Sequence, residues 1–556
     1  MTDRQDTWSR RRFLETVGKA GGAAAVYETM VALGLLRVPA ARAEPLQLPK
    51  DIGKGETVVI LGAGVGGLAA AYELLKAGYA VEILEASSRP GGRNFTVRRG
   101  DEIEQIGRDP QECRFDADPG LYLNAGPGRI PYHHRALLQY CRELGVALEV
   151  YVMESRAELF QTDAAFDKKA VVNRRVANDT RGYIAELLAK AVTKGALDQE
   201  LTREDRQRLL DLLVPFGQVK CDNQYKYTGS SRSGYEVQPA VVQAGKIEPP
   251  LSFQSLLASE FWKHRFYQPE DYEWQTTLFQ PVGGMDQIVV KFVEHVEKLG
   301  GRITKDAQVT RVENSAQGVK VSFRNPRTGK EDSRTADYCI SNIPLPLLRR
   351  IVDNGTFEED FQRAVGAVPF APACKVGWQA DERFWEIGNE IYGGISWIAD
   401  TITQFWYPSA GFFTKKGILT GLYNYGETAD RFGGLPLDER LRVARKGAEK
   451  LHPDFAKYCK IGLGLSIAWQ SVPHLEGGWA DWTGSLEQKK AYQRLLRPDK
   501  RFWVCGDQIS YLPGWQQGAV LSAQHVVEHL PSLGKLEALP VEILETPFSS
   551  AVTGAS

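Results

Sequence analysis

A glycine pattern near the start of the chain constrains the fold more than any other feature of the sequence. The apolar run Thr57–Leu61 stops at Gly62, and the spacing Gly62-x-Gly64-x-x-Gly67 follows directly. A short apolar run that stops at glycine is typical of a buried parallel strand. Glycines at this spacing form the tight turn into a helix and let a pyrophosphate approach the helix N-terminus. The pattern therefore predicts an α/β nucleotide-binding fold.

The residues after the glycines complete a strand–helix–strand unit. Helix formers continue to Lys76, Ala77-Gly78 is a natural C-cap, and Ala80–Leu84 has the composition of a second buried strand. Glu85 ends that strand, where its carboxylate can accept hydrogen bonds from ribose hydroxyls and would repel a 2′-phosphate. The unit predicts a site for FAD or NAD rather than for NADP.

The rest of the chain divides into helical and strand-like regions. Residues 171–213 carry apolar residues at helical spacing and predict a helical insertion. Strand patterns at 308–312 and 319–323 flank a turn, and 338–340 leads into another loop, so we expect the chain to re-enter the first sheet there. The nucleotide-binding domain is therefore expected to be discontinuous.

Composition excludes some classes of partner. With 556 residues, 43% of them hydrophobic, the chain can bury a large core and should form at least two domains. The net charge of -1 gives no overall attraction to nucleic acid or to an anionic membrane surface. The 7 cysteines have no CxxC or other metal spacing, so we expect mostly free, packed thiols and no metal site.

The N-terminus differs from the rest of the chain. Ser9–Leu14 with its consecutive arginines precedes an Ala/Gly-rich stretch that ends at Ala41-Arg42-Ala43, and this resembles a twin-arginine export signal with a cleavage site. We expect a periplasmic or secreted protein. Glu15, Lys19 and Glu28 depart from the usual signal, and the alternative is a disordered basic tail on a cytoplasmic protein. The same charges argue against a membrane span, so the mature protein should be soluble.

The segment Gly91-Gly92-Arg93 distinguishes between the two cofactors. The order of the glycine fingerprint, Glu85-Ala86 and then Gly91-Gly92-Arg93 resembles the flavin-containing amine oxidase family. The resemblance implies FAD as the cofactor, with Arg93 as a fixed cation beside it; the alternative for Arg93 is a surface salt bridge.

The C-terminal end carries the second part of this resemblance. The pattern of Phe502–Asp507 predicts a strand that ends in Gly506-Asp507, and Gly514–Val520 is predicted to begin a helix. In the family this helix N-terminus faces the flavin, where a helix dipole stabilises the charge of the reduced ring. Asp507 would accept from the ribityl chain, in a position where relatives commonly have Glu. The amides near Gln517 and Gly518 would face the carbonyl edge of the ring.

The resemblance implies an α/β fold with α+β character, in which a discontinuous Rossmann-like FAD-binding domain accompanies a substrate-binding sheet domain and a helical insertion. The expected segments are 1–43 (signal), 56–135, 286–350 and 481–530 (FAD-binding domain), 136–285 and 351–480 (substrate-binding and helical domain) and 531–556 (C-terminal tail). The residues expected at FAD are Gly62, Ala63, Gly64, Gly66, Gly67, Glu85, Ala86, Gly92, Arg93, Arg129, Val309, Gly506, Asp507, Gln517, Gly518 and Ala519.

The loop Asn124–Pro131 indicates the substrate class. It looks like the L-amino acid oxidase branch of the family, in which an arginine in such a proline-framed loop binds the α-carboxylate, and Arg129 stands at that position. A planar guanidinium can grip a carboxylate through two parallel hydrogen bonds. The alternative is that Arg129 caps a buried loop.

Two later segments add to the expected site. Lys375 resembles the family lysine that contacts flavin N5 through a water and assists the reaction with oxygen. Tyr423 resembles a tyrosine that bonds the substrate carboxylate, with Tyr425 as the alternative, and Trp515 is expected to form a wall beside the flavin. Arg129 and Lys375 are the predicted catalytic residues.

These features together predict an FAD-dependent L-amino acid oxidase. A hydride leaves the α-carbon for flavin N5, the imino acid hydrolyses to a 2-oxo acid and ammonia, and molecular oxygen is reduced to hydrogen peroxide. An amide-forming amino-acid 2-monooxygenase, an amine or polyamine oxidase, and a flavoprotein without turnover are the alternatives. None of the 8 histidines is needed, and His133-His134 stay unassigned. A homodimer is one open possibility, and the sequence does not indicate the side-chain preference.

Overall fold

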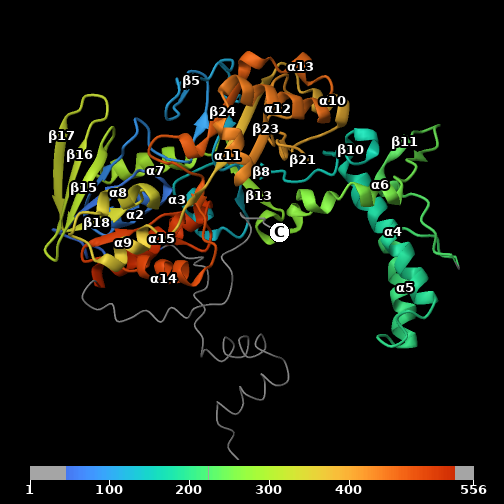
Figure 1. Ribbon diagram of the computed structural model, residues 1–556, viewed down its shortest axis with the longest axis horizontal. Coiled ribbons are helices and arrows are strands. Elements are labelled where there is room, and N and C mark those ends of the chain that lie inside the picture. Colours follow the sequence, from blue (N-terminus) through green and yellow to red (C-terminus); the bar gives the residue numbers. More distant parts are fainter. Residues whose placement is uncertain (1–45, 223, 533–556) are drawn as a thin grey trace, which may run out of the picture. The chain divides into compact units, whose positions relative to one another are not determined.

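The computed structural model describes residues 46–222 and 224–532 (Figure 1). The predicted export signal at 1–43 and all but the first two residues of the predicted tail at 531–556 lie outside the described residues.

A five-stranded parallel sheet forms the frame of the nucleotide-binding domain. Its strand order is β14 (Arg302–Thr304), β2 (Ala80–Leu84), β1 (Thr57–Leu61), β18 (Tyr338–Ser341) and β26 (Phe502–Val504). Every neighbouring pair is parallel. Because these strands come from three distant parts of the chain, the expectation of a discontinuous Rossmann-like domain is confirmed. The exact domain boundaries stay a prediction.

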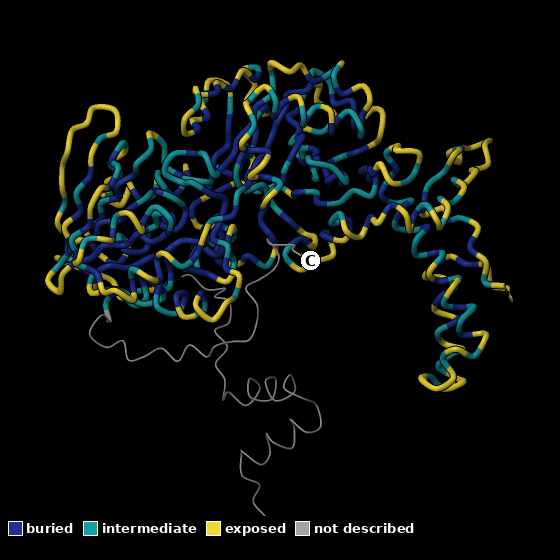
Figure 2. The backbone as a smooth tube through the Cα atoms, in the orientation of Figure 1, coloured by how far each residue is buried: buried dark blue, intermediate teal, exposed yellow. Residues whose placement is uncertain are grey.

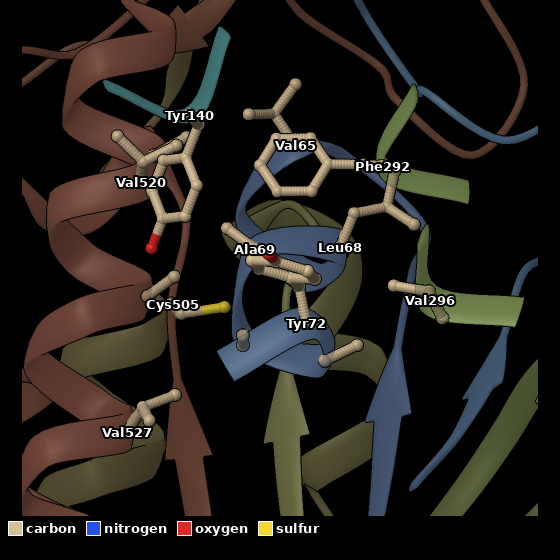
Figure 3. Close-up of a cluster of buried hydrophobic side chains, with 14 of the residues drawn as sticks. Val65, Leu68, Ala69, Tyr72, Tyr140, Phe292, Val296, Cys505, Val520 and Val527 are labelled. Carbon is tan, nitrogen blue, oxygen red and sulfur yellow. The ribbon is translucent and has the colours of Figure 1, made fainter. Parts of the chain in front are cut away.

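Helices cover this sheet with apolar side chains. Helix α2 (Val65–Lys76) follows β1 and packs against α15 (Gln516–His529) and α7 (Gln287–Lys298). Figure 3 shows the core they share, in which Tyr72, Phe292 and Val520 come from three different helices. Helix α2 ends where expected, with Gly78 at φ +90° just beyond its last turn. The strands beneath are buried along almost their whole length (Figure 2).

The chain re-enters the first sheet with fewer strands than the sequence pattern at 308–340 suggested. Only β14 and β18 join it from this part of the chain. The strands predicted at 308–312 and 319–323 are β15 (Gln308–Asn314) and β16 (Val319–Arg324), and they form a separate antiparallel sheet with β17 (Glu331–Ala336). Strand β16 alternates buried residues with exposed or half-buried ones, which suits a sheet with one face covered and the other in solvent.

A seven-stranded sheet lies in the predicted substrate-binding part of the chain. Its order is β10 (Val171–Val172), β9 (Leu159–Gln161), β21 (Ile395–Ile398), β22 (Gln404–Trp406), β23 (Gly417–Tyr425), β20 (Ala373–Ala380) and β24 (Gly464–Ala468). All eight residues of β20 are buried, and its register with β23 sets Lys375 opposite Tyr423. Residues directly opposite on antiparallel strands project from the same face.

A smaller sheet brings three further segments together. Strand β13 (Leu278–Pro281) pairs with both β7 (Ile130–Pro131) and β8 (Leu148–Tyr151). Leu278 is opposite Pro131 on one side and Tyr151 on the other, so this sheet fixes the end of the loop that contains Arg129.

The predicted helical insertion consists of α4 (Asn173–Thr193) and α5 (Arg203–Gly217), which pack against each other. The hydroxyl of Thr202 caps α5 by accepting from the Asp205 amide at 3.1 Å. Both helices alternate between buried and exposed residues (Figure 2). Within the described residues, no helix has the length and apolar character needed to cross a membrane.

The seven cysteines are free, and all but Cys221 are buried.

The remaining helices and strands complete the described part of the chain. The other helices are α3 (Arg135–Glu143), α6 (Phe253–Ala258), α8 (Leu345–Val352), α9 (Glu359–Val365), α10 (Phe384–Asn389), α11 (Glu427–Gly434), α12 (Leu437–Leu451), α13 (Phe455–Tyr458) and α14 (Leu486–Leu495). The other strands are β3 (Thr96–Val97), β4 (Glu102–Ile103), β5 (Gln111–Glu112), β6 (Leu123–Asn124), β11 (Tyr235–Val237), β12 (Lys246–Ile247), β19 (Phe370–Ala371) and β25 (Trp479–Ala480).

Candidate active site

A cavity of about 400 Å³ opens at the carboxyl ends of β1, β2 and β18. Ligands bind at this edge in open parallel sheets. The cavity brings together most of the residues predicted from the sequence: Gly62, Gly64, Gly66, Glu85, Ala86, Gly92, Arg93, Val309, Lys375, Tyr423, Asp507, Trp515 and Ala519. Of the remaining predicted residues, Ala63, Gly67, Arg129, Gly506, Gln517 and Gly518 do not line it.

The glycine turn between β1 and α2 has the geometry that its spacing predicted. Gly62 lies at φ +96°, which side chains rarely allow. Gly67 is needed for packing, because a Cβ at this position would lie 2.2 Å from the carbonyl oxygen of Gly62. The turn therefore brings the N-terminus of α2 against the cavity.

Glu85 holds the turn from the end of β2. Its side chain is buried, and its two carboxylate oxygens accept hydrogen bonds from the amides of Ala63 (2.7 Å) and Ser87 (2.8 Å). Each oxygen keeps a further lone pair that a ribose hydroxyl could use. Ala63, although outside the cavity lining, thus contributes by orienting this carboxylate.

Arg93 and Asp507 join the first and last motifs of the chain. The guanidinium forms a two-point ion pair with the Asp507 carboxylate, through Nη1 at 3.0 Å and through Nη2. Arg93 also donates to the Gly478 carbonyl at 2.6 Å, and Asp507 accepts from the Gly514 amide at 2.8 Å. Arg93 therefore lines the cavity, and its ion pair is largely buried rather than at the surface, with the Asp507 side chain only 8% exposed.

The N-terminus of α15 forms another part of the cavity wall. Trp515 precedes the helix and lines the cavity, as does Ala519 one turn later. The Gln517 side chain is directed elsewhere and accepts from the Leu137 amide at 2.9 Å. Gly518 packs against the preceding loop, where a Cβ would lie 2.2 Å from the Ser510 hydroxyl.

Arg129 is a buried cation among aromatic rings. It is 5% exposed, and its guanidinium carbon lies 4.1 Å from the Trp274 ring centroid and 4.7 Å from that of Trp406. Its Nε and Nη1 have no hydrogen-bond partner among the described residues, and no carboxylate there pairs with it. Burial lowers the pKa of Arg129 from its ordinary value. Arg129, which lies outside the cavity lining, thus carries donors that lack an acceptor.

Lys375 lies close to this cation on β20. Its amine donates to the carbonyls of Asn124 (3.0 Å) and Gly126, in the loop that leads to Arg129. Burial, followed by the positive charge of Arg129, lowers the pKa of Lys375 well below its ordinary value. Lys375 therefore loses its proton more readily than an exposed lysine does.

Tyr423 is the tyrosine that lines the cavity, and Tyr425 does not. The Tyr423 ring centroid lies 5.1 Å from the Lys375 nitrogen and 5.2 Å from the Trp406 ring centroid. Burial raises the pKa of Tyr423, so its hydroxyl is protonated and can donate.

Several residues of the site were not predicted from the sequence. Asn342 lines the cavity directly after β18, and a polar residue at the carboxyl end of a parallel strand is the signal that could have identified it. Gln516 lines it at the start of α15 with a buried amide nitrogen that has no partner among the described residues. Trp274 and Trp406 come from segments with no distinguishing pattern.

This arrangement defines a dinucleotide-binding oxidoreductase with an adjacent buried cation. A sequence model of the flavin-containing amine oxidoreductase family matches residues 65–530. The chain belongs to this family; it is a flavin-dependent oxidase, and its cofactor is FAD. The glycine turn, which a Cβ at Gly67 would block, and the spare lone pairs of Glu85 fit the pyrophosphate and ribose of that cofactor.

Individual relatives agree with this assignment. The chain is 26% identical over 490 residues to the flavin-dependent L-tryptophan oxidase RebO of Lentzea aerocolonigenes, covering 84% of this chain and 96% of that protein. It is 26% identical over 497 residues to an L-amino-acid oxidase of Echis ocellatus, covering 85% and 87%. A solved structure of putrescine oxidase bound to putrescine is similar in fold, with a TM-score of 0.56 at 18% identity, covering 86% and 99%.

Proposed function

We propose that this protein oxidatively deaminates L-amino acids to 2-oxo acids, with release of ammonia and hydrogen peroxide. The observation that carries the proposal is Arg129, a buried guanidinium whose Nε and Nη1 lack a partner among the described residues. A buried charge without a counter-ion is costly. A substrate carboxylate would supply both the missing charge and the missing acceptors.

Each residue around Arg129 has a defined part in this proposal. Arg129 binds the α-carboxylate through two parallel hydrogen bonds, and the hydroxyl of Tyr423 donates a third. Trp274 and Trp406 exclude water from the guanidinium and keep its orientation fixed. FAD, when bound, supplies the acceptor for the hydride and the means of reducing oxygen. The amine of Lys375, whose pKa is lowered by burial and by the charge of Arg129, provides a polar group beside the reacting centre.

The electrostatics favour an amino acid over a polyamine. A diamine brings only positive charge, so it would leave Arg129 unpaired and would place like charges together. The similarity to L-amino-acid oxidases supports the same reading, whereas the likeness to putrescine oxidase concerns the fold alone.

A substrate panel tests the proposal. The purified FAD-loaded protein is offered the L-amino acids, their D-enantiomers and a set of polyamines, while peroxide, ammonia, 2-oxo acid and amide are measured. We expect peroxide, ammonia and 2-oxo acid from L-amino acids alone. An amide with carbon dioxide would instead identify a monooxygenase, and turnover of polyamines alone would identify an amine oxidase. Flavin that no compound in the panel reduces under anaerobic conditions would indicate a flavoprotein without turnover.

We also propose export by the twin-arginine route, which carries folded proteins and so suits an enzyme that acquires its cofactor before export. The support is the sequence pattern at Ser9–Leu14. Replacing Arg10 and Arg11 by lysine should retain the protein in the cytoplasm on cell fractionation. Unchanged export of that variant would contradict the proposal.

A further inference from the structure

Two histidines and a glutamate that the proposed reaction does not use converge near the active site. His133 and His134 precede α3, and Glu273 comes from the 3-10 turn Tyr272–Trp274. The Nε2 atoms of His133 and His134 lie 3.1 Å and 2.9 Å from the same Glu273 oxygen. Sequence reasoning did not find this cluster, because 140 residues separate His133 from Glu273.

The three side chains present a set of donors suited to a transition metal. One ligand atom from each residue can be chosen so that all three lie within 4.8 Å of one another. Imidazole nitrogen and carboxylate oxygen are ligands that Zn²⁺ commonly takes. Without an ion, the Nε2–H groups of both rings donate to the Glu273 carboxylate, because a carboxylate can only accept. The Nδ1 atoms have no partner among the described residues, so each ring can move its proton to Nδ1 when Nε2 binds an ion.

The cluster is protected but accessible. The His134 side chain is 1% exposed, whereas those of His133 and Glu273 are 13% and 12% exposed. Tyr272 stacks on the His133 ring at a centroid distance of 4.2 Å and is itself exposed. A small ion can therefore reach the three ligands from solvent, and water can complete its coordination.

We propose that His133, His134 and Glu273 form a binding site for one divalent transition-metal ion of the Zn²⁺ type. Two histidines and one carboxylate leave a coordination position for water. The site is independent of the substrate assignment, because metal binding is measured without turnover.

The cluster contacts the walls of the substrate site. Glu273 is followed by Trp274, which covers the Arg129 guanidinium at 4.1 Å. Both Trp274 and His134 pack against Trp515, with centroid distances of 5.1 Å and 5.0 Å. A bound ion would hold these segments together, so occupancy should also alter the KM of substrates that Arg129 binds.

Direct metal binding to the FAD-loaded protein tests the site. The protein is first treated with a chelator, and the chelator is then removed. Zn²⁺ is added by equilibrium dialysis, and the bound zinc per flavin is measured. We expect about one Zn²⁺ per flavin, and binding at least about tenfold weaker in Glu273→Gln and in His133→Asn. His264→Asn removes a half-buried histidine outside the cluster and should bind Zn²⁺ as the unaltered protein does.

The flavin spectrum of each variant shows whether the variant is folded. Glu273→Gln keeps the size of the side chain, so a loss of Zn²⁺ binding reports the loss of the carboxylate. Failure of the unaltered protein to bind Zn²⁺ would overturn the proposal. Equal Zn²⁺ affinity in the unaltered protein and Glu273→Gln would overturn it as well, since the ion would then lie elsewhere.

Discussion

Lys375 shows how burial decides the chemical form of a single residue. Its side chain is 2% exposed, and the charge of Arg129 lies close by, so the pKa of Lys375 is well below its ordinary value. Once a substrate carboxylate neutralises Arg129, protonation of the amine becomes less costly. A bound carboxylate therefore makes it easier for Lys375 to hold a proton, while its hydrogen bonds to the Asn124 and Gly126 carbonyls are present without substrate.

Replacing Lys375 by methionine should separate the two halves of the reaction. Methionine has similar length without the amine, so reduction of the flavin by substrate under anaerobic conditions should change little. The rate of reoxidation by oxygen should fall about 10²-fold, because a positioned polar group beside the developing charge is lost. Stopped-flow absorbance measures both rates. Lys416→Met, at a surface lysine, is the control; a normal oxygen rate in Lys375→Met would remove the lysine from this role.

At this scale the sequence predicts residues that lie within a local motif. Arg129 was identified by its proline-framed loop and Glu85 by its place after a strand. Trp274, Trp406 and Glu273 were not identified, because their contacts depend on packing between segments far apart in the chain. The Gln517 side chain accepts from the Leu137 amide, whereas the prediction concerned the backbone amides near Gln517 and Gly518 and stays a prediction.

At the scale of elements, the turn between β1 and α2 is the least tolerant part of the cavity. Gly67→Ala would place a Cβ 2.2 Å from the Gly62 carbonyl oxygen, and this oxygen belongs to the backbone of the turn and cannot swing aside as a flexible side chain would. We expect a several-fold lower flavin-to-protein ratio and a lower melting temperature. Gly388→Ala is the matched control, since its Cβ would meet nothing within 4 Å. Equal flavin content in both variants would show that the turn adapts.

Elements built from contiguous residues were the ones the sequence predicted well. The run from β1 to β2 follows its pattern because strand, glycine turn and helix are each determined locally. The sequence predicted both strands of the β15–β16 hairpin, but it did not predict that they form a separate sheet. Which strands pair depends on how the apolar faces of both strands match, and the residues of the partner strand lie elsewhere in the chain.

At the scale of the whole molecule, distant segments of the chain are held by a few polar contacts. The Arg93–Asp507 ion pair joins residues 414 positions apart, and both belong to the cavity. In the seven-stranded sheet region, His452 bonds the Tyr407 hydroxyl at 2.7 Å, and Ser396 bonds the same hydroxyl at 2.8 Å.

His452 should make stability depend on pH. Burial lowers the pKa of His452 from 6.5 to about 4. Between these values the unfolded chain binds a proton that the folded chain does not, so stability falls as the pH drops from 6.5 towards 4, by up to about 3 kcal/mol. His452→Gln keeps an acceptor for Tyr407 and does not titrate. Urea midpoints measured from pH 7 to pH 4 should therefore decline less in the variant; parallel declines would contradict this.

The central claim is that Arg129 selects substrates by their carboxylate, and Arg129→Met tests it most directly. Methionine keeps an unbranched, apolar side chain among the aromatic rings while removing the charge. The measurement is kcat/KM for an active L-amino acid and for the amine that its decarboxylation gives, in the unaltered protein and in the variant. We expect kcat/KM for the amino acid to fall roughly a hundredfold, the equivalent of about 3 kcal/mol for a lost charged bond, and the preference over the amine to disappear. An unchanged preference for the amino acid in Arg129→Met would contradict the account.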